Sequence, residues 1–111
     1  MDLVDLAWSQ ARAGMRRATE HAESDSPGWS SQALAYLESY AKAHDRFPGW
    51  FVTHEASLQN AVPKASGKAW GSIFTKAARL GWIEKDGYTT DPNRNCNPVP
   101  VWRSLIYRRA A

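Results

Sequence analysis

The segment that decides the fold is residues 66–81, which read SGKAWGSIFTKAARLG. Ser66 is a favoured helix N-cap, and Gly81 readily adopts the left-handed conformation in which many helices end. Together they predict a helix over residues 66–80. At about 100° per residue, its apolar and polar side chains fall on separate arcs. The apolar arc holds Ala69, Trp70, Ile73, Phe74, Ala77, Ala78 and Leu80, and the polar arc holds Lys68, Gly71, Ser72, Thr75, Lys76 and Arg79.

The polar arc of this helix carries three cations and no acid. An exposed helix ordinarily mixes both signs of charge. Long cationic side chains reach phosphates or guanine edges, and short hydroxyl side chains allow close approach to base pairs. We therefore predict that this arc faces the major groove of DNA. A merely solvated helix face is the alternative.

Charge is unevenly divided along the 111 residues, whose net charge is +3. Residues 1–61 carry a net charge of −3, whereas residues 62–111 carry +6. A concentration of positive charge is expected where a surface faces phosphates, although a solvated basic face is again the alternative.

Two β segments follow the helix, at residues 82–90 and 99–103, with a polar, turn-forming loop between them. They predict a hairpin whose wing spans residues 88–99. Pro100 predicts a free edge on its second strand. The tip residues Asn93, Arg94 and Asn95 suit contact with a minor groove or the DNA backbone, but asparagines serve tight turns equally well.

The elements expected before the helix are a helix over residues 2–22, a turn over residues 24–28, a helix from Ser30 or Ser31 to His44, a short strand at Phe51-Val52 and a short helix over residues 54–59 capped by Thr53. The order of short helix, tight connection, helix and hairpin predicts a winged helix-turn-helix. The fold class is mainly α with a small β-hairpin. Residues 1–25 form an extra N-terminal amphipathic helix and turn, and residues 26–111 form the winged domain.

The second half of the chain resembles small winged-helix proteins of bacteriophages and prophages, roughly over residues 47–105. The residues that carry the resemblance are Ala69-Trp70-Gly71, Ala77-Ala78-Arg79-Leu80-Gly81-Trp82-Ile83, Gly87-Tyr88 and Pro98-Val99-Pro100-Val101-Trp102-Arg103-Ser104. This resemblance implies a DNA-binding protein of replication or regulatory regions. It leaves residues 1–25 unexplained.

Four aromatic residues of this half, Trp70, Trp82, Tyr88 and Trp102, could stack on bases or pack in the core. Core packing is the favoured interpretation, because Trp70 lies on the apolar arc and the two hairpin tryptophans can face the helices.

Enzymatic chemistry has no sequence support. The three histidines and Cys96 lack the spacing of a metal site, and Gly67-Lys68 lacks the remaining residues of a phosphate-binding loop. We expect no catalytic residue, cofactor or metal, and Cys96 is interpreted as an incidental loop thiol. No apolar run is long enough to span a bilayer, so a cytoplasmic protein without membrane contact is expected.

The predicted function is that of a double-stranded DNA-binding protein, a phage-type replication or transcription regulator. The predicted contacts are Lys64, Ser66, Lys68, Ser72, Thr75, Lys76, Arg79, Asn93, Arg94 and Asn95. The alternative is a winged-helix protein-interaction module that docks on a host or phage protein. For the N-terminal helix, packing on its own domain and a homodimer seam are both open.

Overall fold

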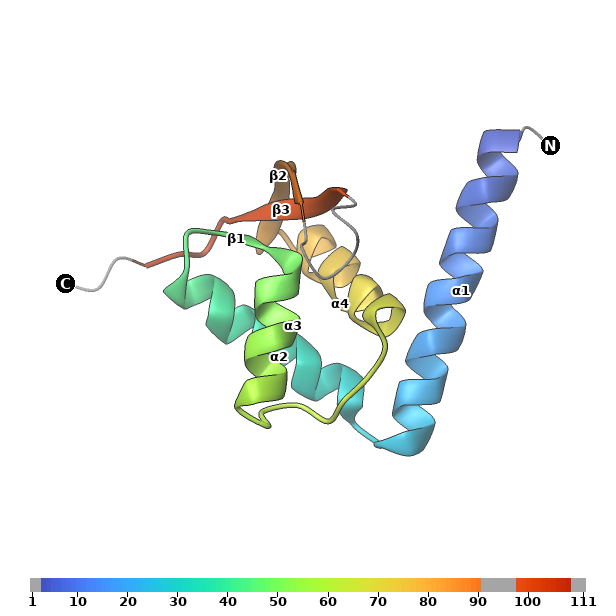
Figure 1. The fold of residues 1–111 in the computed structure, drawn as a ribbon, viewed down its shortest axis with the longest axis horizontal. Helices are drawn as coiled ribbons and strands as arrows, with labels where there is room; N and C mark the ends of the chain where they lie inside the picture. The colour runs from blue at the N-terminus through green and yellow to red at the C-terminus, as the bar shows by residue number, and fades with distance from the viewer. Residues whose placement is uncertain (1–2, 91–97, 109–111) are drawn as a thin grey trace.

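A computed structural model describes residues 3–90 and 98–108, apart from the side chains of residues 3–9 and 11. Within these ranges the chain forms four helices and a three-stranded sheet (Figure 1). The elements are α1 (Leu3–Asp25), α2 (Trp29–Ala43), β1 (Arg46–Pro48), α3 (Gly49–Leu58), α4 (Gly67–Arg79), β2 (Ile83–Thr90) and β3 (Pro98–Ser104). The predicted β-hairpin is confirmed, and with β1 added the fold is mixed α/β rather than mainly α with a hairpin.

The sheet is antiparallel in the order β1-β3-β2. The expected strand at Phe51-Val52 is wrong, because both residues lie in α3 and Val52 is fully buried. The third strand is instead β1, whose Phe47 pairs with Trp102 of β3. Three residues are too few to show an alternating pattern, so only their pairing with the distant β3 identifies this strand.

Pro100 lies in the central strand of the sheet, not in an edge strand. The predicted free edge of this strand is therefore wrong. The β1 partners of β3 begin at Val101, so Pro100 pairs with Tyr88 of β2 and lies beyond the end of β1. A residue without an N–H is tolerated there because β1 does not reach it.

The third helix begins earlier than expected, at Gly49 instead of His54. Thr53 therefore lies inside α3 and does not cap it, and its hydroxyl donates to the carbonyl of Trp50 at 3.1 Å. The second helix begins at Trp29, one residue before the expected Ser30.

The hydrophobic core lies between α2, α3, α4 and the sheet. The largest fully buried side chains are Trp29, Leu37, Phe47, Val52 and Ile83. Trp29 meets Trp70 edge to face, with ring centroids 5.6 Å apart, and its indole N–H donates to the carbonyl of Pro63 at 2.9 Å. These contacts join α2 to α4 and to the segment around Pro63 that precedes α4.

The prediction of core packing is confirmed for Trp70 and Trp102, and Trp82 is partly buried against the core. Trp102 stacks on Phe74 with ring centroids 5.6 Å apart, which attaches the sheet to α4. The prediction is wrong for Tyr88, which is 65% exposed. Tyr88 follows the register irregularity of β2, which lies between Lys85 and Tyr88, so the alternation of the preceding strand residues does not carry over to it.

Helix α1 runs without interruption through Gly14 and lies beside α4 (Figure 1). Ala22 is buried in the common core, and Ala18 packs against it. The N-terminal helix thus packs on its own domain, as one of the two predicted arrangements requires. None of the described helices is long and apolar enough to cross a membrane.

From α2 onward, the order of helix, strand, two helices and hairpin is compatible with a winged-helix arrangement. This order puts α4 between α1 on one side and the other helices on the opposite side (Figure 1).

Candidate nucleic-acid interface

Helix α4 has the two ends that the sequence predicts. Ser66 is the N-cap, and its hydroxyl accepts a hydrogen bond from the N–H of Ala69 at 3.2 Å. At the other end Gly81 has a φ of 82°, in the left-handed region that favours glycine. The ends of α4 are therefore set by local chemistry, independently of what packs against the helix.

The two arcs of α4 are largely as predicted. Five residues of the apolar arc are buried: Ala69, Trp70, Ile73, Phe74 and Ala77. Four residues of the polar arc are exposed: Lys68, Thr75, Lys76 and Arg79. Leu80 is an exception on the apolar arc. It is 50% exposed, because the helix ends at Arg79 and Leu80 lies beyond its last turn.

No exposed cation of this arc forms an ion pair with another described residue. Lys68, Lys76 and Arg79 are therefore exposed without a carboxylate partner among the described residues. Thr75 donates its hydroxyl proton to the carbonyl of Gly71 at 2.9 Å and keeps its oxygen free to accept. The arc offers cations and hydroxyl groups without a competing carboxylate.

Ser72 departs from the predicted arrangement. Its place on the polar arc predicts an exposed side chain, but Ser72 is half-buried beneath α1. Its hydroxyl lies 2.7 Å from the hydroxyl of Thr19 and 2.8 Å from the carbonyl of Ala69. Beside it, Met15 lies over Gly71, where an added Cβ would come 3.4 Å from the Met15 sulfur. Helix α1 therefore crosses the middle of the predicted reading face.

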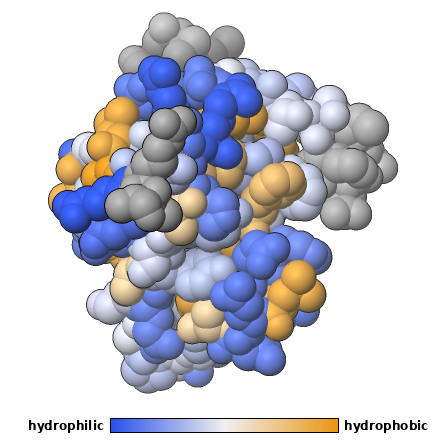
Figure 2. Space-filling model, turned by 90° about the vertical axis from the view of Figure 1, so that its left-hand side faces the viewer, coloured by the Kyte–Doolittle hydropathy of each residue, from blue (hydrophilic) through white to orange (hydrophobic). Residues whose placement is uncertain are grey.

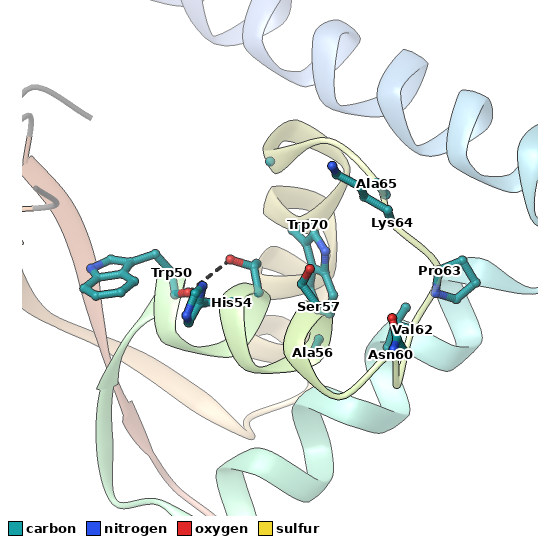
Figure 3. Close-up of a pocket in the computed structure, with 12 residues that line it drawn as sticks. Trp50, His54, Ala56, Ser57, Asn60, Val62, Pro63, Lys64, Ala65 and Trp70 are labelled. Carbon is teal, nitrogen blue, oxygen red and sulfur yellow. Dashed lines mark hydrogen bonds between the residues drawn. The ribbon is translucent and has the colours of Figure 1, made fainter. Parts of the chain in front are cut away.

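Lys64 is exposed on the segment that leads into α4, next to a hollow of about 480 Å³. The hollow also takes in His54 and Ser57 from α3, and Trp70 from α4 itself (Figure 3). Lys64 and the α3 side chains thus share one depression beside Gly67, at the start of α4. The sequence analysis selected Lys64 but missed His54 and Ser57, since only the turn between α3 and α4 brings them together.

The predicted wing contacts Asn93, Arg94 and Asn95 lie outside the described residues. The described part of the hairpin adds Lys85, which is exposed and lines a hollow of about 330 Å³ together with Thr75 of α4. The sequence analysis did not select Lys85. The position of Lys85 in an alternating strand could have indicated that its side chain points outward. The strand pattern could not have indicated that Lys85 lies close to α4.

Two other cations of the sheet are already paired. Arg103 donates to Glu84 at 2.6 Å, and Arg46 donates to Asp86 at 2.9 Å. Hydrogen bonding to Glu84, followed by the charge of that carboxylate, raises the pKa of Arg103. These two arginines of the sheet are thus engaged by carboxylates, whereas the cations of α4 stay unpaired among the described residues.

Groups that could hold a metal are absent from the described ranges, where no three or more His, Cys, Asp or Glu residues cluster. The side chains gathered at α4 are suited to binding an anionic surface.

Comparison of the chain with protein-family models, with curated proteins and with solved structures finds no match. The resemblance to winged-helix proteins of phages stays a prediction.

Proposed function

We propose that this protein is a winged helix-turn-helix protein that binds double-stranded DNA, with α4 as the recognition helix and the β2–β3 hairpin as the wing. The observation that carries the proposal is the division of α4. One face is buried in the core, and the other exposes Lys68, Lys76 and Arg79 with no acidic neighbour on the arc. A partner rich in phosphate satisfies such a face better than water alone.

The contacts divide into two kinds. Lys64 and Lys68, near the start of α4, and Lys85, on the wing, suit phosphates because a lysine offers a mobile point charge. Lys76, farther along the helix, suits a phosphate in the same way, whereas Arg79 suits a guanine edge in the major groove. The first kind supports affinity for any duplex, and the second supports preference for a sequence. A phage-type replication or transcription regulator needs both.

The test is a fluorescence anisotropy titration of a DNA duplex with the Lys76→Glu/Arg79→Glu variant. Both side chains are exposed, so the fold tolerates the change. We expect a loss of affinity of about tenfold or more, since each reversal replaces attraction to phosphate with repulsion.

The matched control is Lys42→Glu/Arg108→Glu, which makes the same change in net charge. Its two residues are exposed and lie together, where the N–H of Arg108 donates to the carbonyl of Lys42. We expect this control to bind nearly as well as the wild type. Equal losses in both variants would contradict an interface on α4.

A protein-interaction module is the second candidate function. The observation in its favour is that α4 already binds a helix, namely α1, through its polar face. On the side of the molecule away from α1, Figure 2 shows hydrophobic areas that are small and lie between hydrophilic side chains. Failure of the wild type to bind any duplex at low salt, together with recovery of one stoichiometric protein partner, would favour this candidate.

A further inference from the structure

The α1–α4 contact occupies the face that the proposed function assigns to DNA. Gly71 and Ser72 belong to the polar arc and lie about halfway along α4, and they are the α4 residues against which Met15 and Thr19 lie. A helix with its side chains is about 10–12 Å in diameter. The major groove is about 12 Å wide and admits one helix. It therefore has no room for α4 while α1 is packed across the same face.

From this overlap we infer that α1 is a displaceable cover of α4, and that DNA and α1 compete for one face of this helix. The inference rests on the proposed function. It assigns a role to residues 1–25, which the sequence analysis left unexplained.

The contact surface of α1 is suited to release. Among its described side chains only Ala22 is buried, while Met15, Ala18 and Thr19 are half-buried. The remaining buried core residues come from Trp29 and beyond. The core of α2, α3, α4 and the sheet therefore stays filled when α1 leaves.

The charges of α4 favour the exchange of α1 for DNA. The described α1 residues nearest α4 are uncharged. These residues cover the neutral Gly71 and Ser72 and give the neighbouring cations no partner. A DNA backbone provides phosphates to those cations. The competition thus exchanges a small neutral contact for a charged one.

The junction after α1 provides the pivot. Ser26-Pro27-Gly28 forms a turn in which Gly28 has a φ of 85°. The Glu23 carboxylate accepts hydrogen bonds from the N–H groups of Gly28 at 2.9 Å and Ser30 at 2.7 Å. The end of α1 is thereby held to the start of α2, and the rest of α1 can swing away from α4.

A reversible cross-link tests the inference in the full-length chain. In the Thr19→Cys/Ser72→Cys variant, with Cys96→Ser to remove the native thiol, the two sulfurs replace oxygens that lie 2.7 Å apart. A disulfide of about 2.05 Å needs only a small adjustment from that distance. We expect the oxidised form to bind a mixed-sequence DNA duplex about tenfold more weakly or worse, and reduction to restore affinity, because the cross-link removes the binding-competent state.

A second variant opens the contact instead of closing it. Ala18→Gln puts a larger neutral side chain on the face of α1 that packs against the core, next to Thr19, without changing the net charge. We expect binding several-fold tighter than wild type, because a larger fraction of the molecules has α4 uncovered. Hydrogen exchange of the α1 amides provides a direct readout, and DNA should accelerate exchange over residues 12–22.

Equal DNA affinity of the oxidised and reduced forms would contradict the inference that α1 covers α4, and it would leave the proposed function intact. So would slower or unchanged exchange in α1 on DNA binding. If the wild type, the reduced form and Ala18→Gln are all folded and none binds a duplex at low salt, the proposed function fails and the cover fails with it.

Discussion

The hydroxyl groups of Thr19 and Ser72 lie 2.7 Å apart and join α1 to the polar face of α4. Each hydroxyl also contacts a carbonyl of its own helix, Thr19 that of Met15 at 2.9 Å and Ser72 that of Ala69 at 2.8 Å. Two protons cannot satisfy three contacts as donated hydrogen bonds. The hydroxyl that donates to the other hydroxyl cannot also donate to the carbonyl of its own helix. The link between the two helices is therefore modest in strength.

The cations of α4 should determine the salt dependence of DNA binding. We expect Lys68→Ala and Lys76→Ala each to reduce the slope of log affinity against log salt by about 1, because each removes about one phosphate contact. The measurement is a series of anisotropy titrations over a range of salt concentrations. Lys42→Ala is the control, since Lys42 pairs with Glu38 on α2 and should leave the slope unchanged. An unaltered slope in both α4 variants would exclude these lysines as phosphate contacts.

The N-cap of α4 allows stability and binding to be separated at one residue. We expect Ser66→Ala to lower the free energy of unfolding by about 1 kcal/mol, because the N–H of Ala69 loses its acceptor. Ser66→Asp retains a capping oxygen and should keep near-wild-type stability while weakening DNA binding, since a carboxylate repels phosphate. Urea unfolding and anisotropy give the two quantities. Equal DNA affinity of Ser66→Asp and wild type would show that Ser66 does not lie near the phosphate backbone of the DNA.

Two glycines should respond in opposite directions to the same change. Gly81 ends α4 with a φ of 82° and has open space around it, so Gly81→Ala should cost about 1–2 kcal/mol from backbone strain alone. Gly14 lies within α1, also with open space around it, so Gly14→Ala should stabilise the helix by up to about 1 kcal/mol. Denaturant midpoints of both variants check the prediction. A stabilising Gly81→Ala would be incompatible with the left-handed end of α4.

Glu23 should make the α1–α2 junction sensitive to acid. The Ser30 side chain, then the N–H groups of Ser30 and Gly28, lower the pKa of Glu23 from its ordinary 4.5. Because the folded-state pKa is the lower one, the contribution of Glu23 to stability is complete above about pH 4.5 and is lost as the pH falls through the folded-state value.

The matched variant for this prediction is Glu23→Gln, which cannot ionise. We expect the stability difference between wild type and Glu23→Gln to be largest at neutral pH and to shrink in acid. Urea unfolding at several pH values measures it. A difference that is independent of pH would show that the carboxylate charge does not hold this junction.

Much of the candidate interface could be predicted from local patterns. Ser66 and Gly81 act within one turn of their own positions, and the spacing of Lys68, Lys76 and Arg79 places them on one arc whatever surrounds the helix. The β2–β3 hairpin is local in the same sense, because its strands are separated only by their own turn. These features were predicted correctly.

The sequence by itself determined α4: its two ends, its buried face and the sign of its exposed charge. Only the tertiary structure decided what covers that helix, because Thr19 and Ser72 are 53 residues apart in the sequence and their contact leaves no local periodicity. The same reason applies to β1, which is a strand only through its pairing with β3, and to the exposure of Tyr88. Periodicity identifies which face of a helix is polar, whereas the packing of distant segments decides whether that face is open.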